Sequence, residues 1–160
     1  MTHIVIFNVV FLWVVAHAVL HGGAPERWTA AFMVAASVAT LVRPYDPLVT
    51  FQALDLPLFA IDAALLAGFI WVALRAERYW PMWIAALQLT AIAVHIIRAI
   101  DLQLVPLVYE WAVGKIAYPM ILLLVIGTAR HRSRLQRFGS DPDWSRHERR
   151  NPEALARTHR

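Results

Sequence analysis

Apolar residues fall into five long runs along the chain, separated by short polar segments. The runs cover residues 4–20, 28–42, 56–74, 79–98 and 104–128. As helices they would extend about 22 to 38 Å, close to the thickness of the hydrocarbon core of a bilayer. The pattern therefore predicts an all-α fold, a polytopic membrane protein with five transmembrane helices in a small bundle.

Two of these runs leave an alternative open. The run 28–42 is the shortest and reaches only about 22 Å, so it could dip into the membrane without crossing it. The run 4–20 could instead be a signal peptide, because the sequence from Ala16 to Ala18 resembles a small-x-small cleavage site. Residues 2–8 contain no Lys or Arg for a positive n-region, which favours a first membrane span.

The run 79–98 combines aromatic and polar features on one helix. Tyr and Trp residues between 79 and 83 are typical of a membrane interface. At 100° per residue, Gln88 and His95 lie within about 20° of each other, and Arg98 is about 80° away on the same side. This helix is expected to present a polar face to its neighbours.

Small residues recur every four positions in the second and third runs. Ala31, Ala35 and Ala39 form one such series, and Ala60, Ala64 and Gly68 form the other. Series of this kind allow two helices to approach closely in a membrane. We therefore predict that the second and third helices pack together through these faces.

The composition agrees with a membrane protein and divides the chain in two. Hydrophobic residues make up 59% of the 160 residues and charged residues 16%. Residues 1–129 hold six Lys or Arg and seven Asp or Glu, whereas residues 130–160 hold nine Arg and four acids. We expect a transmembrane domain over 1–129 and an Arg-rich, mostly disordered tail over 130–160.

The arginines that follow the last run predict the orientation and the lipid contacts. By the positive-inside rule they place the C-terminus in the cytoplasm, so five spans place the N-terminus outside the inner membrane of a prokaryote. They are also expected to contact anionic lipid headgroups, and no motif supports nucleic-acid binding. These residues are Arg130, Arg132, Arg134 and Arg137.

This topology places polar side chains from several helices at a similar depth. Asn8 would lie about 6 Å, and Asp62 and Glu110 each about 9 Å, from the outer end of their helices. A buried carboxylate is costly unless it is paired, hydrated or protonated. The predicted polar cluster, which serves either as structural ion pairs or as a ligand or proton-relay site, comprises Asn8, Asp62, His95, Arg98, Glu110 and Lys115.

Few other chemistries find support in the sequence. The chain has no cysteine, which excludes disulfides, thiolate metal sites and covalently attached c-type haem. His17 and His21 have metal-ligand spacing, but the predicted topology separates them from His95 by most of the membrane, which disfavours a haem or metal site. We predict no catalytic residue, no metal and no cofactor.

The sequence alone favours a non-enzymatic accessory or scaffold subunit that contacts lipid, other membrane proteins or a second copy of itself. The alternative is a transporter or proton-relay module built on the polar cluster. An intramembrane enzyme that uses Asp62 or Glu110, or a haem-binding protein, is the third option. Two carboxylates without a nucleophile are a weak signal for an enzyme.

Overall fold

The computed structural model describes residues 2–42, 55–100, 106–141 and 144. Within these ranges the protein is all-α and contains five helices and no strand. The helices are α1 (Thr2–His21), α2 (Ala24–Val42), α4 (Leu56–Arg75), α5 (Trp80–Ile100) and α6 (Pro106–Phe138). The all-α class is confirmed, and each of the five helices overlaps one predicted run.

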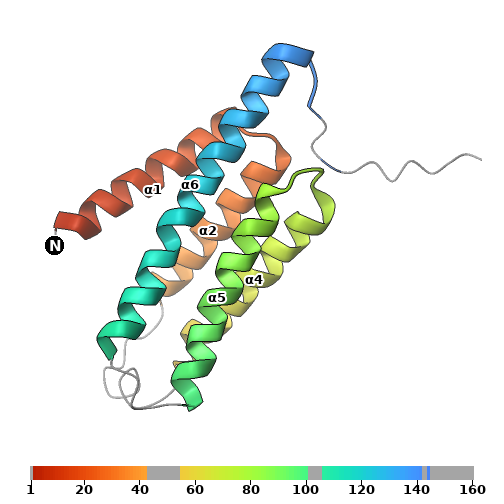
Figure 1. Cartoon of the computed structure of the whole chain (residues 1–160). Helices are drawn as coiled ribbons and strands as arrows, with labels where there is room; N and C mark the ends of the chain where they lie inside the picture. The colour runs from red at the N-terminus through yellow and green to blue at the C-terminus, as the bar shows by residue number, and fades with distance from the viewer. Residues whose placement is uncertain (1, 43–54, 101–105, 142–143, 145–160) are drawn as a thin grey trace, which may run out of the picture.

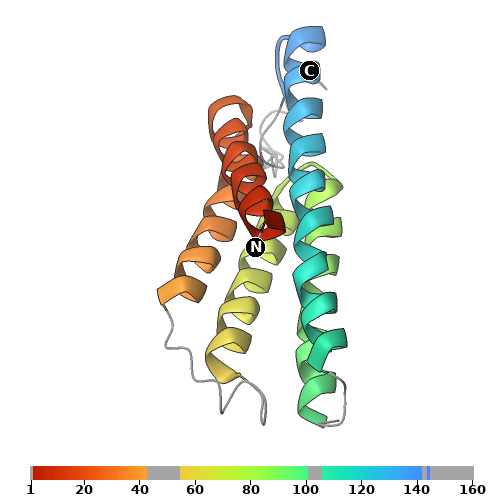
Figure 2. The same cartoon turned by 90° about the vertical axis from the view of Figure 1, so that its left-hand side faces the viewer.

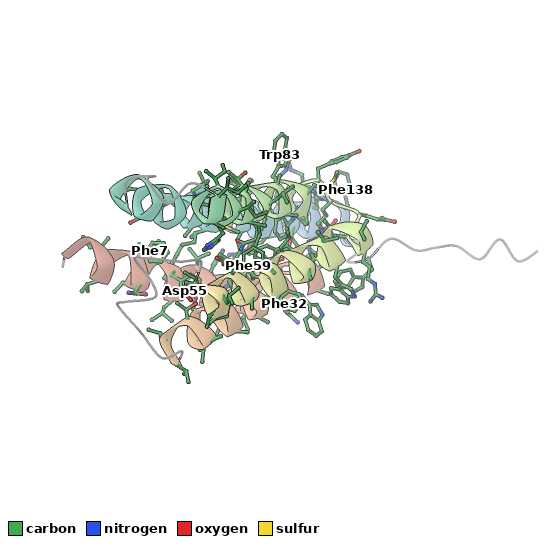
Figure 3. All side chains as sticks on the ribbon, turned by 90° about the horizontal axis from the view of Figure 1, so that it is seen from below. Phe7, Phe32, Asp55, Phe59, Trp83 and Phe138 are labelled. Carbon is green, nitrogen blue, oxygen red and sulfur yellow. The ribbon has the colours of Figure 1, made fainter. Side chains whose placement is uncertain are left out.

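The helices alternate in direction and pack into one bundle (Figure 1). Each helix contacts the next one in the order α1, α2, α4, α5 and α6. In addition, α6 contacts both α1 and α2. Figure 2 shows α5 and α6 on one side, with α1, α2 and α4 on the other. Viewed from below, side chains fill the space between these two sides (Figure 3). Trp83 of α5 and Phe138 of α6 are labelled there on the side formed by these two helices.

The helix ends follow local sequence signals. Asp55 caps α4, because its side chain accepts a hydrogen bond from the backbone N–H of Leu58 at 3.0 Å. Between α1 and α2, Gly22 lies so close to the carbonyl oxygen of Ala18 that a Cβ atom would be 2.4 Å away. Glycine therefore permits this abrupt turn.

α2 and α6 extend beyond the predicted runs. α2 begins at Ala24, so Pro25 and Glu26 belong to its first turn, where proline needs no hydrogen-bond partner. α6 continues through Pro119 and ends at Phe138, and its 33 residues span about 50 Å. The first part of the predicted tail is thus helical.

The contact between α2 and α4 uses a different side of α2 from the one predicted. Ala31, Ala35 and Ala39 are exposed, whereas Phe32 lies against Gly68 of α4. A Cβ atom on Gly68 would be 3.0 Å from the Phe32 ring. The predicted contact between α2 and α4 therefore exists, but it is made by the Phe32 ring against Gly68.

Two described helices are long and apolar enough to cross a membrane. They are Leu56–Arg75, with a mean hydropathy of 2.0, and Trp80–Ile97, with 1.6. Val5–His21 is a shorter apolar helix. The helical bundle is thus confirmed, while membrane crossing by all five helices stays a prediction.

Candidate functional site

A cavity of about 330 Å³ is lined by all five helices, and it opens to the outside of the bundle where Asn8, Thr40 and Leu41 are exposed. Most of its lining is apolar, with Phe7 from α1, Met33 from α2, Leu65 from α4, Ala91 from α5 and Met120 from α6. The polar residues that line it are Asn8, Ser37, Thr40, Asp62 and Gln88. Of the lining residues in the described part of the chain, Asp62 is the one with an ionisable side chain.

Both carboxylate oxygens of Asp62 have partners on α5. The side-chain amide of Gln88 donates to Oδ1 at 3.0 Å, and Nε2 of His95 lies 2.8 Å from Oδ2. The His95 side chain is fully buried, whereas that of Asp62 is 17% exposed. Asp62 thus lines the cavity, whereas His95 contacts Asp62 and does not itself line the cavity.

The tight link between α4 and α5 explains this arrangement. In an antiparallel hairpin that turns between Arg75 and Trp80, Asp62 falls at a level between Gln88 and His95. Gln88 and His95 share a helical face, so both can reach the same carboxylate. The sequence predicted that face, but Gln88 was not among the predicted cluster residues.

The six predicted cluster residues have different positions. Asn8 and Asp62 line the cavity, and His95 contacts Asp62. Lys115 is exposed, and its Nζ atom lies 5.3 Å from the centre of the Tyr118 ring. The side chains of Arg98 and Glu110 lie outside the described part of the structure. The structure therefore brings three of the six together, and their role in binding stays a prediction.

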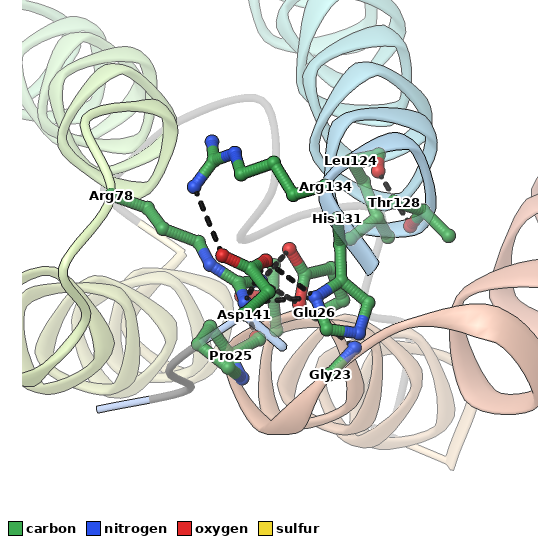
Figure 4. Close-up of polar contacts among 10 residues, drawn as sticks. Gly23, Pro25, Glu26, Arg78, Leu124, Thr128, His131, Arg134 and Asp141 are labelled. Atoms are coloured by element: carbon green, nitrogen blue, oxygen red, sulfur yellow. Dashed lines mark hydrogen bonds and ion pairs between the residues drawn. The ribbon is translucent and has the colours of Figure 1, made fainter. Parts of the chain in front are cut away.

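A second polar cluster joins the α4–α5 link to α2 and to the end of α6 (Figure 4). The guanidinium of Arg78 donates to both carboxylate oxygens of Glu26, and it also donates to Asp141 at 2.8 Å. Asp141 in turn lies 2.7 Å from Nδ1 of His131 and accepts from Arg134 at 3.3 Å. These residues come from α2, the α4–α5 link, α6 and the segment after α6.

Sequence reasoning did not find this second cluster. The predicted second run began after Glu26, and Arg134 was predicted to contact lipid headgroups. Gly139, with a φ of 70°, turns the chain back at the end of α6 and so brings Asp141 to the bundle. The one sequence signal for this cluster was Asp141, an acidic residue that follows Gly139 and the Arg-rich end of α6.

The two clusters differ in what they can do chemically. In the second cluster the charged groups bind one another, as buried ion pairs do when they fix helices in register. Asp62 instead presents a carboxylate to a cavity large enough for a small molecule. No group of three His, Asp or Glu side chains in the described ranges has the arrangement of a metal site. The cavity is therefore the candidate functional site.

The comparisons with known proteins do not assign this site. No protein-family model, no curated protein and no solved structure matches the chain.

Proposed function

We propose that this protein is a small multi-pass membrane protein that binds a mainly apolar small molecule between its helices and acts as a transport or relay module. The observation that carries the proposal is the cavity, which all five helices line and into which Asp62 places a carboxylate. Apolar walls with a few convergent polar groups are typical of small-molecule sites, and 330 Å³ lies within their range.

The outer surface of the helices supports a membrane location. Only 17% of the apolar window in α4 and 39% of that in α5 is buried inside the bundle. The core helix of a soluble protein would be mostly buried. Large apolar side chains such as Leu12, Leu74 and Trp83 are more than 60% exposed. A lipid environment would remove this apolar surface from water.

The direction of the helices fits the proposed topology. The α1–α2 turn, the α4–α5 link and the end of α6 lie at one end of the bundle (Figure 1). With the Arg-rich end of α6 in the cytoplasm, the cavity would open in the outer half of the inner membrane. Arg130, Arg132 and Arg137 would then lie near anionic headgroups, while Arg134 contacts Asp141.

A matched pair of variants tests ligand binding in the cavity. Ala36 lines the cavity, whereas the adjacent Ala35 is exposed. We expect Ala36→Phe to fill the cavity and to lower probe affinity by about tenfold or more, because a ring cannot share this space with the probe. Ala35→Phe should bind like the unmodified protein.

The probes are benzyltrimethylammonium and its uncharged carbon isostere neopentylbenzene. Saturation-transfer NMR on protein in lipid nanodiscs measures binding of each. Partition into lipid is the same for both variants, so a difference between Ala36→Phe and Ala35→Phe reports on the cavity. Equal signals from the two variants for both probes would show that the cavity is not a binding site.

An accessory role is a second candidate, and the exposed face of α2 favours it. Ala31, Ala35 and Ala39 lie on the outside of the bundle, where a helix of another membrane protein could approach closely. Under this candidate, Ala35→Phe and Ala39→Phe would release a partner that co-purifies in mild detergent, whereas Ala36→Phe would retain it. Retention by all three variants would exclude a partner on this face.

A further inference from the structure

The hydrogen bonds within the wall of the cavity bear on which ligand it accepts. We propose that the cavity selects an uncharged, lipid-soluble molecule whose polar end is a hydrogen-bond donor, such as an alcohol or a phenol. This inference rests on the proposed function, because it names the ligand class of the same cavity. It follows from where the polar hydrogens of the cavity wall already go.

The side-chain amide of Gln88 uses its hydrogens on Asp62. Its Nε2 atom donates to the backbone carbonyl oxygen of Asp62 at 3.2 Å and to Oδ1 at 3.0 Å. An amide nitrogen has two hydrogens, so both are engaged. Gln88 is only 3% exposed, and it lines the cavity. Toward a ligand, Gln88 therefore offers its carbonyl oxygen, which can only accept a hydrogen bond.

The two hydroxyl groups of α2 in the cavity wall are committed in the same way. Ser37 donates to the carbonyl oxygen of Met33 at 2.8 Å, and Thr40 donates to that of Ala36 at 2.9 Å. A hydroxyl has one hydrogen, and a backbone carbonyl can only accept, so the direction of both bonds is fixed. The lone pairs of both hydroxyl oxygens stay available, and both groups act as acceptors toward a ligand.

The carboxylate of Asp62 adds a charged acceptor to this wall. Oδ1 accepts from Gln88, and Oδ2 lies 2.8 Å from Nε2 of His95. Each carboxylate oxygen has two lone pairs, so each can accept a further hydrogen bond. The side chain is 17% exposed and lines the cavity. Its negative charge strengthens a bond from an O–H group and repels a carbonyl or ether oxygen.

The remaining polar lining residue in the described ranges, Asn8, lies at the opening of the cavity. Its amide has both donors and an acceptor, and Asn8 is exposed, as are Thr40 and Leu41. Leu41 is 83% exposed, and in a bilayer such an apolar side chain faces lipid. A ligand would therefore enter from the lipid. This route favours an uncharged molecule, because a charge is costly to move through hydrocarbon.

These acceptors determine how ligands of one size are ranked. An alcohol pairs its O–H group with an acceptor of the wall. A hydrocarbon of the same shape gains only the apolar contacts. A ketone brings a further acceptor to a wall that has its hydrogens engaged, so the ketone oxygen stays unpaired beside a carboxylate. We therefore expect the order alcohol, hydrocarbon, ketone.

The test uses dimethylbenzylcarbinol, neopentylbenzene and isobutyrophenone, which have the same number of heavy atoms. Saturation-transfer NMR in nanodiscs measures each affinity relative to the probe concentration in the lipid, which protein-free nanodiscs provide. Binding in the cavity is the part that Ala36→Phe removes and Ala35→Phe retains. We expect the alcohol to bind about tenfold or more tightly than the ketone, with the hydrocarbon between them.

A variant of Asp62 tests whether the carboxylate sets this preference. Asp62→Asn keeps the shape of the side chain but replaces one acceptor oxygen by an NH₂ group, which donates. We expect the preference for the alcohol over the ketone to fall about tenfold or more in this variant. A merely structural effect would weaken both probes alike and leave their ratio unchanged, and an unchanged ratio would contradict the role of Asp62.

The outcomes distinguish the two proposals. If the three probes bind in the cavity of the unmodified protein with equal affinity, or if the ketone binds best, ligand binding stands and the selection of a donor is wrong. This comparison needs no variant of Asp62 that could fail to fold. If none of the probes distinguishes Ala36→Phe from Ala35→Phe, both the binding function and the selection are wrong.

Discussion

Glu26 shows how strongly a single residue can depend on a distant partner. It lies in the first turn of α2, its side chain is fully buried, and Arg78 compensates its charge across 52 residues of sequence. The backbone N–H of Gly23 adds a hydrogen bond at 3.1 Å. Because burial without a partner is costly, this pair holds α2 against the α4–α5 link.

We expect Glu26→Gln to destabilise the protein by about 2–3 kcal/mol, because it removes the charge that compensates a buried guanidinium. The neighbouring Arg27 is exposed, so Arg27→Gln should change the stability by less than about 0.5 kcal/mol. Thermal unfolding in detergent measures both. Equal unfolding temperatures for the two variants would contradict a stabilising role of the pair.

At the scale of elements, α5 and α6 meet where the Trp80 ring covers Gly127. A Cβ atom at position 127 would be 2.8 Å from this ring, and Trp80 is itself buried in the core. The ring therefore has little room to move. Glycine costs helix propensity in α6, but it allows the indole to lie against the helix backbone.

The same contact gives a prediction for Gly127→Ala. The gain in helix propensity is about 1 kcal/mol, and overpacking against a fixed ring costs about 1–3 kcal/mol, so we expect a net loss of stability of about 1 kcal/mol. In a Trp80→Leu background the ring is absent, and Gly127→Ala should stabilise the protein. Thermal unfolding of the four proteins measures this coupling, and additive effects would contradict it.

At the scale of the whole molecule, the five helices alternate in direction, but α1 is tilted relative to the others and begins part-way along the bundle (Figures 1 and 2). From Thr2, α1 runs toward the same end of the bundle at which α6 ends (Figure 1). In the five-span topology that we propose, the start of α1 would face the outer side of the bilayer and the end of α6 the cytoplasm. The tail end also holds the second polar cluster.

Cysteine labelling tests this arrangement, and the natural chain has no cysteine to interfere. In right-side-out vesicles we expect a membrane-impermeant maleimide to label Thr2→Cys and not Ser140→Cys. Inverted vesicles should give the reverse pattern. Labelling of both positions from the same side would contradict the five-span proposal and the depth that we infer for the cavity.

How much of the fold could be predicted follows from the range of the interactions. Each helix appears in the sequence as an apolar run, since hydropathy and glycine or proline turns act over a few neighbouring residues. The ends of α2 and α6 were harder to locate, because Glu26 and the basic residues before Phe138 look like link and tail when their distant partners are unknown. For the candidate site, the sequence showed that Gln88 and His95 share a helical face, but it did not show that Asp62 is the partner of both.

The sequence by itself determined that this protein is helical, roughly where its helices lie, and that Asp62 and His95 are polar residues within two apolar helices. Only the tertiary structure decided that these two side chains, 33 residues apart in the sequence, contact each other. It also decided that Phe32 rather than the alanine series of α2 faces α4, and that Asp141 binds Arg78. The reason is physical. Local periodicity specifies a helix, whereas the rotation of each helix about its axis depends on the packing of all its neighbours at once.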